Sequence, residues 1–279
     1  MPKNIFAKAK SKQEPAKPRP RVGLALGAGG GRGLAHIGIL QALEAHNIPI
    51  DLIAGCSIGS IVGAVYAAGT DLRMLELYCG TLAGKDILDV ALPHMGGLLR
   101  GDKLEEIVRV LTHDLSFGET RIPFFCTAVD LASGKLEVLQ QGKIHRAVRA
   151  SIAIPGVFTP VRMDNKVYAD GGILEEMPVD LLRVHGADIV IASDLSLRRG
   201  ITEADRLSPV KTLMRAVDIM QLEMTRLLDQ KIDVRIVPDA SFMGTVSTVG
   251  AAESIQEGRR ATEELMPRIL ELVGGLDRQ

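Results

Sequence analysis

Short runs of apolar residues alternate along this chain with longer segments in which polar residues recur at helical spacing. The runs have the length of buried strands, and the longer segments have the period of helices packed on one side. The predicted strands are Val22 to Leu26, Leu52 to Ala54, Phe124 to Leu131, Leu136 to Leu139, Asp188 to Ser193 and Val234 to Val237. Because strands alternate with helices, we expect a mostly parallel sheet covered on both faces, with chemical groups at the carboxyl ends of its strands.

Helices are predicted in the segments between and after these strands. They cover Leu34 to His46, Lys103 to Thr112, Pro178 to His185 and a final segment that begins near Ala251. The inward face of the final helix is expected to consist of Ile255, Gly258, Leu265 and Ile269. Within it, Pro267 predicts a kink or a restart of the helix.

A further helical face lies near residues 210–227, where apolar side chains recur every three or four positions. It consists of Val210, Leu213, Val217, Met220, Met224 and Leu227. A methionine-rich face can bind lipid, but packing against the core explains the same pattern. We expect this face to be buried in the core.

The composition describes a folded protein of 279 residues, 46% of them hydrophobic and 24% charged. With 33 basic and 34 acidic residues the formal net charge is −1, which argues against nucleic acid as the main partner. Cys56, Cys79 and Cys126 are far apart in the chain, so we expect reduced, buried thiols rather than disulfides or a zinc site.

Residues 1–20 form a basic, proline-rich tail that we expect to be disordered. The tail lacks the apolar run of a secretory signal, so we expect a cytoplasmic protein, peripheral to a membrane at most. Contact between the tail and anionic lipid is the alternative interpretation. The uncharged stretch from Leu52 to Thr70 is long enough for a membrane span, but its glycines and its flanking residues Asp51 and Asp71 favour a strand, a turn and a helix.

A glycine-rich loop directly follows the first predicted strand. Its glycines are Gly27, Gly29, Gly30, Gly31 and Gly33, with Arg32 among them. Such a loop can turn several backbone N–H groups toward one negative oxygen, either a phosphate, a pyrophosphate or a transient oxyanion. The chain lacks the Gly-Lys-Ser/Thr ending of a P-loop and the Tyr-x-x-x-Lys pair of short-chain dehydrogenases, so we set both classes aside.

The second glycine motif surrounds Ser57, with Gly55 before it and Gly59 after it. This G-x-S-x-G pattern is typical of a sharp strand-to-helix turn that exposes a nucleophilic hydroxyl. Ser57 is therefore the candidate nucleophile. Cys56 is a rival, but nothing near it in the sequence lowers the pKa of its thiol, and we expect it to face inward.

The third motif is Asp170 followed by Gly171 and Gly172, after a probable strand. Asp170 has two interpretations, a residue that forms a turn and a base that activates Ser57. An ordinary carboxyl with a pKa of about 4 is a weak base at neutral pH. As a base, Asp170 is therefore expected to be at least partly buried and hydrogen-bonded to Ser57.

A conventional triad would also need a histidine. The three candidates are His36, His145 and His185. Only His185 follows Asp170 in the chain order typical of such triads, and its place at a predicted helix end favours a capping role. A Ser57–Asp170 dyad is therefore the leading hypothesis, and a Ser-His-Asp esterase stays open as the alternative.

These motifs, in this order, resemble the patatin-like phospholipase family, most closely bacterial patatin-like proteins and the esterase domain of the neuropathy target esterase group. The resemblance covers about Arg21 to Asp194. Its matching segments are LGAGGGRGLAHIG at 26–38, AGCSIGS at 54–60, GGLLRG at 96–101, ASIAIPG at 150–156 and DGG at 170–172. The resemblance implies a three-layer α/β/α fold and hydrolysis of fatty acyl esters with no metal or cofactor.

The same resemblance assigns roles by position. Ser57 would be the nucleophile, Asp170 its base, and the backbone around Gly29, Gly30 and Gly31 the oxyanion hole, braced by Arg32. Ala28 and Glu175 depart from the family, which often has Gly and Asn at these positions. Residues 21–279 would form the hydrolase domain, of which 198–232 match weakly.

The expected function is that of a lipid acyl hydrolase, a phospholipase or a lysophospholipase that acts through an acyl-enzyme. Its partners would be a lipid or another fatty acyl ester and, transiently, a membrane surface. A non-catalytic regulatory or binding module with the same fold is the alternative. Residues 92–100 are interpreted either as an apolar flap over the site or as a plain surface loop.

Overall fold

The computed structural model describes residues 19–82, 84–92, 95–196, 209–227, 231–244 and 249–274. The predicted tail at residues 1–20 lies outside these ranges except for its last two residues, and so do parts of the segment 198–232.

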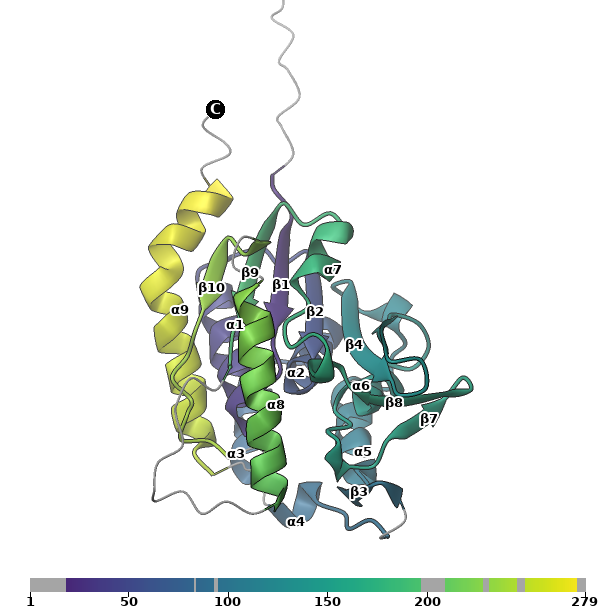
Figure 1. Ribbon diagram of the computed structural model, residues 1–279. Helices are drawn as coiled ribbons and strands as arrows, with labels where there is room; N and C mark the ends of the chain where they lie inside the picture. Colours follow the sequence, from purple (N-terminus) through teal and green to yellow (C-terminus); the bar gives the residue numbers. More distant parts are fainter. Residues whose placement is uncertain are drawn as a thin grey trace, which may run out of the picture.

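The middle layer of the molecule is a sheet of eight strands (Figure 1). Its spatial order is β10 (Val234–Ile236), β9 (Ile189–Ser193), β1 (Val22–Leu26), β2 (Leu52–Cys56), β4 (Phe124–Asp130), β8 (Lys166–Asp170) and β7 (Val161–Met163), and β5 (Lys135–Leu139) pairs with β4. The strands from β10 to β4 are parallel, whereas β5 and β8 are antiparallel to β4, and β7 is antiparallel to β8. The sheet is mostly parallel, as predicted. A separate parallel pair joins β3 (Gly97–Leu99) to β6 (Gly156–Phe158). The segment 92–100, interpreted above as a flap or a loop, therefore contains a strand, and its residues 93 and 94 lie outside the described residues.

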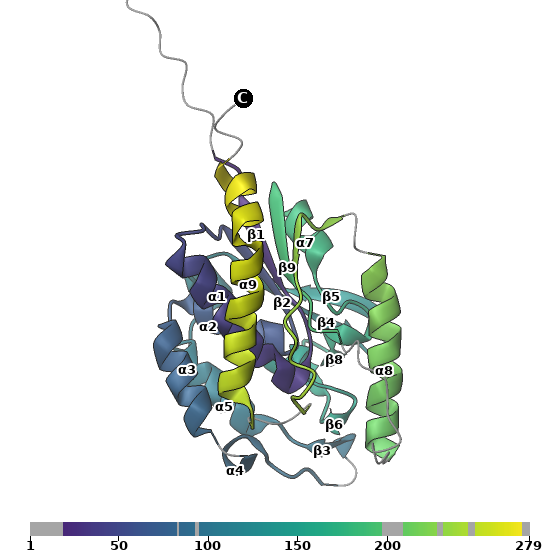
Figure 2. The same ribbon diagram turned by 90° about the vertical axis from the view of Figure 1, so that its left-hand side faces the viewer.

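Helices cover both faces of the sheet and complete the predicted three layers, α/β/α (Figure 2). One face carries α1 (Ala35–Ala45), α2 (Ile58–Ala68), α3 (Leu72–Thr81), α5 (Asp102–Leu111), α6 (Ile144–Ser151) and α9 (Ala251–Gly274), and the other carries α7 (Val179–Val184) and α8 (Pro209–Arg226). The remaining short helices are α4 (Gly84–Ile87), η1 (Gly30–Leu34), η3 (Phe117–Glu119) and η4 (Gly171–Ile173). A hydrophobic core lies on each face of the sheet, and alternate residues of β1 contribute to one or the other. Leu24 packs against the α1 and α2 side, and Ala25 packs against the α7 side. Burial on both faces explains why β1 is continuously apolar.

The apolar face predicted for residues 210–227 is not buried in the core. Leu213, Met220 and Leu227 of α8 are 49%, 59% and 82% exposed. Asp218 and Gln221 of α8 make hydrogen bonds to residues far away in the sequence, and Met214 and Val217 line a cavity beside them. The prediction is wrong because apolar period alone does not decide which side of a helix faces the protein when polar side chains find partners there.

The final helix is continuous from Ala251 to Gly274, and Pro267 lies inside it. The restart predicted at Pro267 is therefore wrong. Met266 and Ile269 are buried on either side of the proline, and this packing holds the last turns of the helix in place.

No helix in the described parts of the chain has the length and apolar character of a membrane span. The stretch from Leu52 to Thr70 divides into β2, a turn and α2, as predicted. Cys56, Cys79 and Cys126 are buried and free of disulfides, which confirms the expectation for the thiols.

Helices α1 and α9 approach each other through two glycines. A Cβ atom on Gly258 would overlap the carbonyl oxygen of Ala35, and one on Gly38 would overlap the carbonyl oxygen of Ile255. The helix backbones are thus in direct contact, and the absence of a side chain at these positions allows it.

We expect Gly258→Ala to lower the free energy of unfolding by about 1–3 kcal/mol, because the added methyl group forces the two helices apart. Urea denaturation followed by circular dichroism measures this change. Gly80→Ala in α3 is the matched control, since a Cβ there would meet no described atom within 4 Å. That control should leave the stability unchanged or raise it by about 0.5–1 kcal/mol. Equal stability of the two variants would contradict the close approach of α1 and α9.

Candidate active site

Ser57 occupies the turn between β2 and α2 and has a strained backbone, with φ 52° and ψ −125°. A residue other than glycine is rarely found in this conformation, and it persists only where the surroundings enforce it. The first turn of α2 packs directly against the end of β1. A Cβ atom on Gly59 would overlap the Leu26 carbonyl oxygen, so only glycine fits there. The backbone N–H of Ser57 donates to the Ser151 hydroxyl at 3.0 Å. The turn therefore projects the Ser57 side chain away from both elements, as in a nucleophile elbow.

Asp170 reaches Ser57 from an antiparallel strand. Cys56 of β2 is in register with Thr127 of β4, and the next residue of β4, Ala128, is in register with Asp170 of β8. The end of β8 therefore lies level with the end of β2 although the two strands run in opposite directions. The Ser57 hydroxyl donates to Asp170 Oδ2 at 2.5 Å, and both side chains are buried.

Burial raises the pKa of Asp170 from its ordinary 3.8 to about 6. Hydrogen bonds from Ser57, from the Gly172 amide and from Cys56 lower it, but their sum is smaller than the effect of burial. The Gly172 N–H donates to the second oxygen, Oδ1, at 2.8 Å and fixes the carboxylate plane. A carboxyl with this pKa is a stronger base than an ordinary aspartate and is still ionised at neutral pH.

Cys56 is fully buried, and its Sγ lies 3.9 Å from Asp170 Oδ1. Burial and the charge of Asp170 raise the pKa of its thiol well above the usual range. A thiol that stays protonated is a poor nucleophile.

The glycine loop follows β1 and is anchored at its start, where the N–H groups of Gly27 and Ala28 donate to the carbonyls of Ser193 and Glu176. Gly29 has φ 155° and Gly30 has φ 57°, conformations that favour glycine. The loop then enters η1, and the first N–H groups of a helix have no acceptor within it. Such free amides at a helix start can stabilise a negative oxygen.

The two departures from the family pattern are accommodated. Ala28 is buried, and its N–H is one of the loop anchors. Glu175 supports the turn after Asp170 through its backbone, since its N–H donates to the Gly171 carbonyl at 2.9 Å. Its carboxyl is largely removed from water, and this burial raises the pKa to about 7.

None of the three candidate histidines has a hydrogen bond to Ser57 or Asp170 among the described contacts, and each has another partner. His36 lies beneath the glycine loop, with Nε2 2.9 Å from the Gly27 carbonyl, and burial lowers the pKa of its ring to about 4. His145 pairs with Glu105 on α5, and His185 contacts the Leu181 carbonyl at the end of α7. The hydrogen bond between Ser57 and Asp170 thus forms without any of these three rings.

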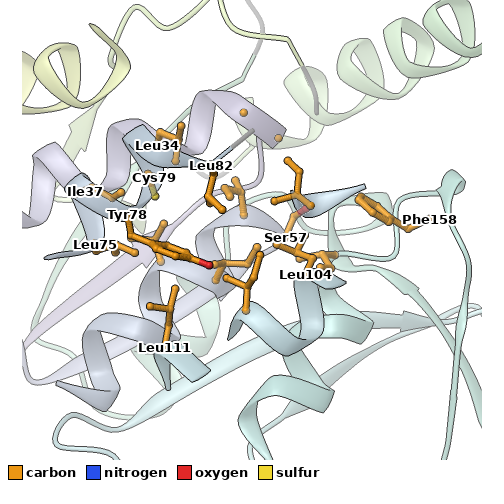
Figure 3. Close-up of a pocket in the computed structure, with 18 of the residues that line it drawn as sticks. Leu34, Ile37, Ser57, Leu75, Tyr78, Cys79, Leu82, Leu104, Leu111 and Phe158 are labelled. Carbon is orange, nitrogen blue, oxygen red and sulfur yellow. The ribbon is translucent and has the colours of Figure 1, made fainter. Parts of the chain in front are cut away.

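An apolar cavity of about 130 Å³ opens beside Ser57 (Figure 3). Leu34, Leu75, Leu104, Leu111 and Phe158 are among its lining residues, together with the backbone of Gly30 and Gly31. The Tyr78 ring lies across the cavity, and its hydroxyl end points toward the side that holds Leu104 and Ser57. A smaller, more polar cavity of about 40 Å³ also borders Ser57 and includes Asp170, Gly29, Arg32 and Gln221.

Three residues near the site were not singled out from the sequence. Ser151, which binds the Ser57 amide, lies within the segment 150–156 that carries the family resemblance. Asp218 and Gln221 contact the glycine loop and the Asp170 turn from α8. In the sequence, Asp218 and Gln221 are indicated only as two polar residues, three positions apart, within a helical segment whose apolar residues recur at regular spacing. Among the described residues, no group of three or more metal-binding side chains occurs.

Comparison with known proteins gives sequence relatives for part of the chain. An uncharacterised NTE family protein of Mycobacterium bovis is 41% identical over 167 residues, which is 59% of this chain and 46% of that protein. Lysophospholipase NTE1 of Cryptococcus neoformans is 34% identical over 170 residues, which is 59% of this chain and 10% of that protein. The match thus spans less than half of the length of either relative.

Solved structures show the same fold at low sequence identity. VipD from Legionella pneumophila has a TM-score of 0.63 and 16% identity, over 91% of this chain and 68% of that chain. The type III effector protein ExoU has a TM-score of 0.54 and 14% identity, over 92% of this chain and 54% of that chain. The family model for patatin-like phospholipases matches residues 24–183. Because this match covers more than half of the sequence, the chain belongs to the patatin-like phospholipase family.

Proposed function

We propose that this protein is a serine hydrolase that cleaves fatty acyl esters of lipids, and that residues 21–279 form its hydrolase domain. The observation that carries the proposal is the 2.5 Å hydrogen bond between the Ser57 hydroxyl and the buried Asp170 carboxylate, at the mouth of an apolar cavity. Family membership supports lipid esters as substrates, and one relative is named a lysophospholipase.

In the proposed reaction, Ser57 Oγ attacks the ester carbonyl carbon while Asp170 accepts the hydroxyl proton. The negative carbonyl oxygen would lie against the N–H groups at Gly29 and Gly30. Asp170 then returns the proton to the departing alcohol oxygen, and an acyl group remains on Ser57. Water attacks this acyl-enzyme by the same steps, releases the fatty acid and restores both side chains.

The two cavities that Ser57 lines suit the two halves of such a substrate. The apolar cavity would hold the acyl chain, because each methylene group that leaves water for an apolar site contributes about 0.8 kcal/mol. The smaller cavity contains carboxylate, guanidinium and amide groups and suits the polar alcohol portion.

Ser57→Ala and Asp170→Asn are each expected to lower kcat for ester hydrolysis by at least about 1,000-fold, because each removes a group that acts in the transition state. A fluorophosphonate probe should label the unaltered protein at Ser57 and fail to label Ser57→Ala. Cys56→Ala tests the rival nucleophile and should keep the labelling at Ser57, although it removes a weak hydrogen bond to Asp170. Failure of the unaltered protein to react would favour a non-catalytic module, and loss of labelling in Cys56→Ala would transfer the nucleophile to that residue.

Hydrolysis should depend on the ionisation of Asp170. Because the base acts as a carboxylate and its pKa is about 6, kcat/KM should rise with pH through that value and reach a plateau above it. Initial rates between about pH 4.5 and 8.5 measure the profile. A profile that is already flat across this range, as expected for a carboxyl with the ordinary pKa of 3.8, would contradict the role of burial.

The same raised pKa predicts how stability varies with pH. A buried acid of this kind favours the folded state while it is protonated, so its contribution is complete below 3.8 and is lost as the pH rises through about 6. Asp170→Asn carries no charge at any pH. The increase in Tm that it produces should therefore be larger at about pH 8 than at about pH 5. Thermal melts of both proteins give this difference, and equal increases at the two values would count against it.

Tyr78 is expected to limit the length of the acyl chain, because its ring occupies part of the apolar cavity. Tyr78→Ala should shift the preference toward longer esters, with about a fourfold gain in kcat/KM for each additional buried methylene. Tyr78→Phe keeps the ring and serves as the control. A series of p-nitrophenyl esters of increasing length measures both profiles, and an unchanged profile in Tyr78→Ala would refute the role of the ring.

A further inference from the structure

Helix α8 contacts the site through three polar side chains on one of its faces. Asp218, Gln221 and Thr225 are three and four residues apart, a spacing that aligns them along the helix. Asp218 Oδ1 lies 3.2 Å from Arg32 Nη2, and Gln221 Nε2 donates to the Gly172 carbonyl at 2.8 Å. Thr225 donates to the Glu176 carboxylate at 2.9 Å. One helix therefore holds both the glycine loop and the turn that follows Asp170.

These polar contacts give α8 a defined position beside the site, where Met214 and Val217 also line the smaller cavity. Leu213, Met220 and Leu227 of the same helix are exposed. The hydrogen bonds of Asp218, Gln221 and Thr225 are directional, so they fix the position of α8 relative to the glycine loop and the Asp170 turn.

The ion pair of Asp218 with Arg32 is largely removed from water, since the two side chains are only 15% and 12% exposed. Screening by salt is weak at such a site, and removal of one partner leaves the other charge uncompensated. Glu176 is a second acid near Arg32, but burial raises its pKa to about 7 and its carboxylate accepts from Ser196 and Thr225. Asp218 is therefore the acid that directly contacts the guanidinium.

Arg32 connects Asp218 to the glycine loop. Its Nε donates to the Gly29 carbonyl at 2.9 Å, while Nη2 faces Asp218. A trans peptide is planar, with its carbonyl and N–H pointing in opposite directions. The direction of the Gly29 carbonyl therefore sets that of the Gly30 N–H, and Gly30 lines both cavities beside Ser57.

We propose that Asp218 is a positioning residue for the hydrolysis, and that α8 holds the oxyanion loop in its active geometry through Arg32 and Gly29. The inference rests on the function proposed above. A loop of glycines can adopt many backbone conformations, so an external contact must select the one that aligns its N–H groups. The aligned N–H stabilises charge that develops in the transition state, and it contributes much less to binding of the neutral ester.

Asp218→Asn is the first test, because asparagine keeps the size of the side chain and removes its charge. We expect kcat to fall by about 10- to 100-fold, somewhat less than for loss of an oxyanion donor itself, with KM within about twofold of the unaltered value. The rate of labelling of Ser57 by a fluorophosphonate should fall in parallel. Glu223→Gln on the same helix removes only a surface ion pair with Arg226 and should leave both rates unchanged.

A double-mutant cycle separates positioning from a general loss of structure. If Asp218 acts through Arg32, the double variant Asp218→Asn, Arg32→Gln should be no slower than Arg32→Gln alone. A kcat of the double variant that falls by the product of the two single decreases would overturn the proposed route. A lower Tm of Asp218→Asn with an unchanged kcat per labelled site would overturn it as well. A normal kcat in Asp218→Asn would overturn this inference alone. An unaltered protein that neither hydrolyses esters nor reacts with the probe would instead overturn the proposed function on which it rests.

Discussion

A carboxylate held out of water beside a hydroxyl group is the interaction on which the rest of this molecule depends. Ionised Asp170 is costly to bury, and it is accepted because Ser57 and the Gly172 amide donate to its two oxygens. Both donors have demanding local geometry. Ser57 requires a strained turn at the end of β2, and the Gly172 amide requires a tight turn after β8. The sheet register brings these two turns together, so the fold and the chemistry share one constraint.

Two cavities of different polarity border the Ser57–Asp170 contact. The backbone of the glycine loop and the side chain of Ser57 border both an apolar and a polar cavity. An ester has the same division, with a hydrocarbon chain on one side of the carbonyl and an oxygen-bearing group on the other. In the function proposed above, the different solvation of its two halves would orient such a molecule at Ser57, which lines both cavities.

Local sequence patterns predicted the parallel strands, the main helices and the residues of the Ser57–Asp170 contact, because glycines at strand ends and buried apolar runs are local signals. The antiparallel direction of β8 has no such signal. It depends on pairing with β4, which is distant in the sequence. The orientation of α8 was predicted wrongly for a related reason: Asp218 pairs with Arg32, 186 residues away, and apolar period contains no information about that partner.

The order of the strands has a consequence for where this domain can be divided. β1 lies between β2 and β9, and β9 follows the segment that carries the family motifs. The Ser193 carbonyl of β9 anchors the glycine loop, and Ser254 of α9 donates to the Arg32 carbonyl from behind. A fragment limited to residues 24–183 would keep every recognisable motif, yet it would expose β1 as a bare sheet edge and remove the contacts of the loop with Ser193 and Ser254. The central sheet thus extends beyond the segment that the family model matches, since β9 and β10 follow residue 183.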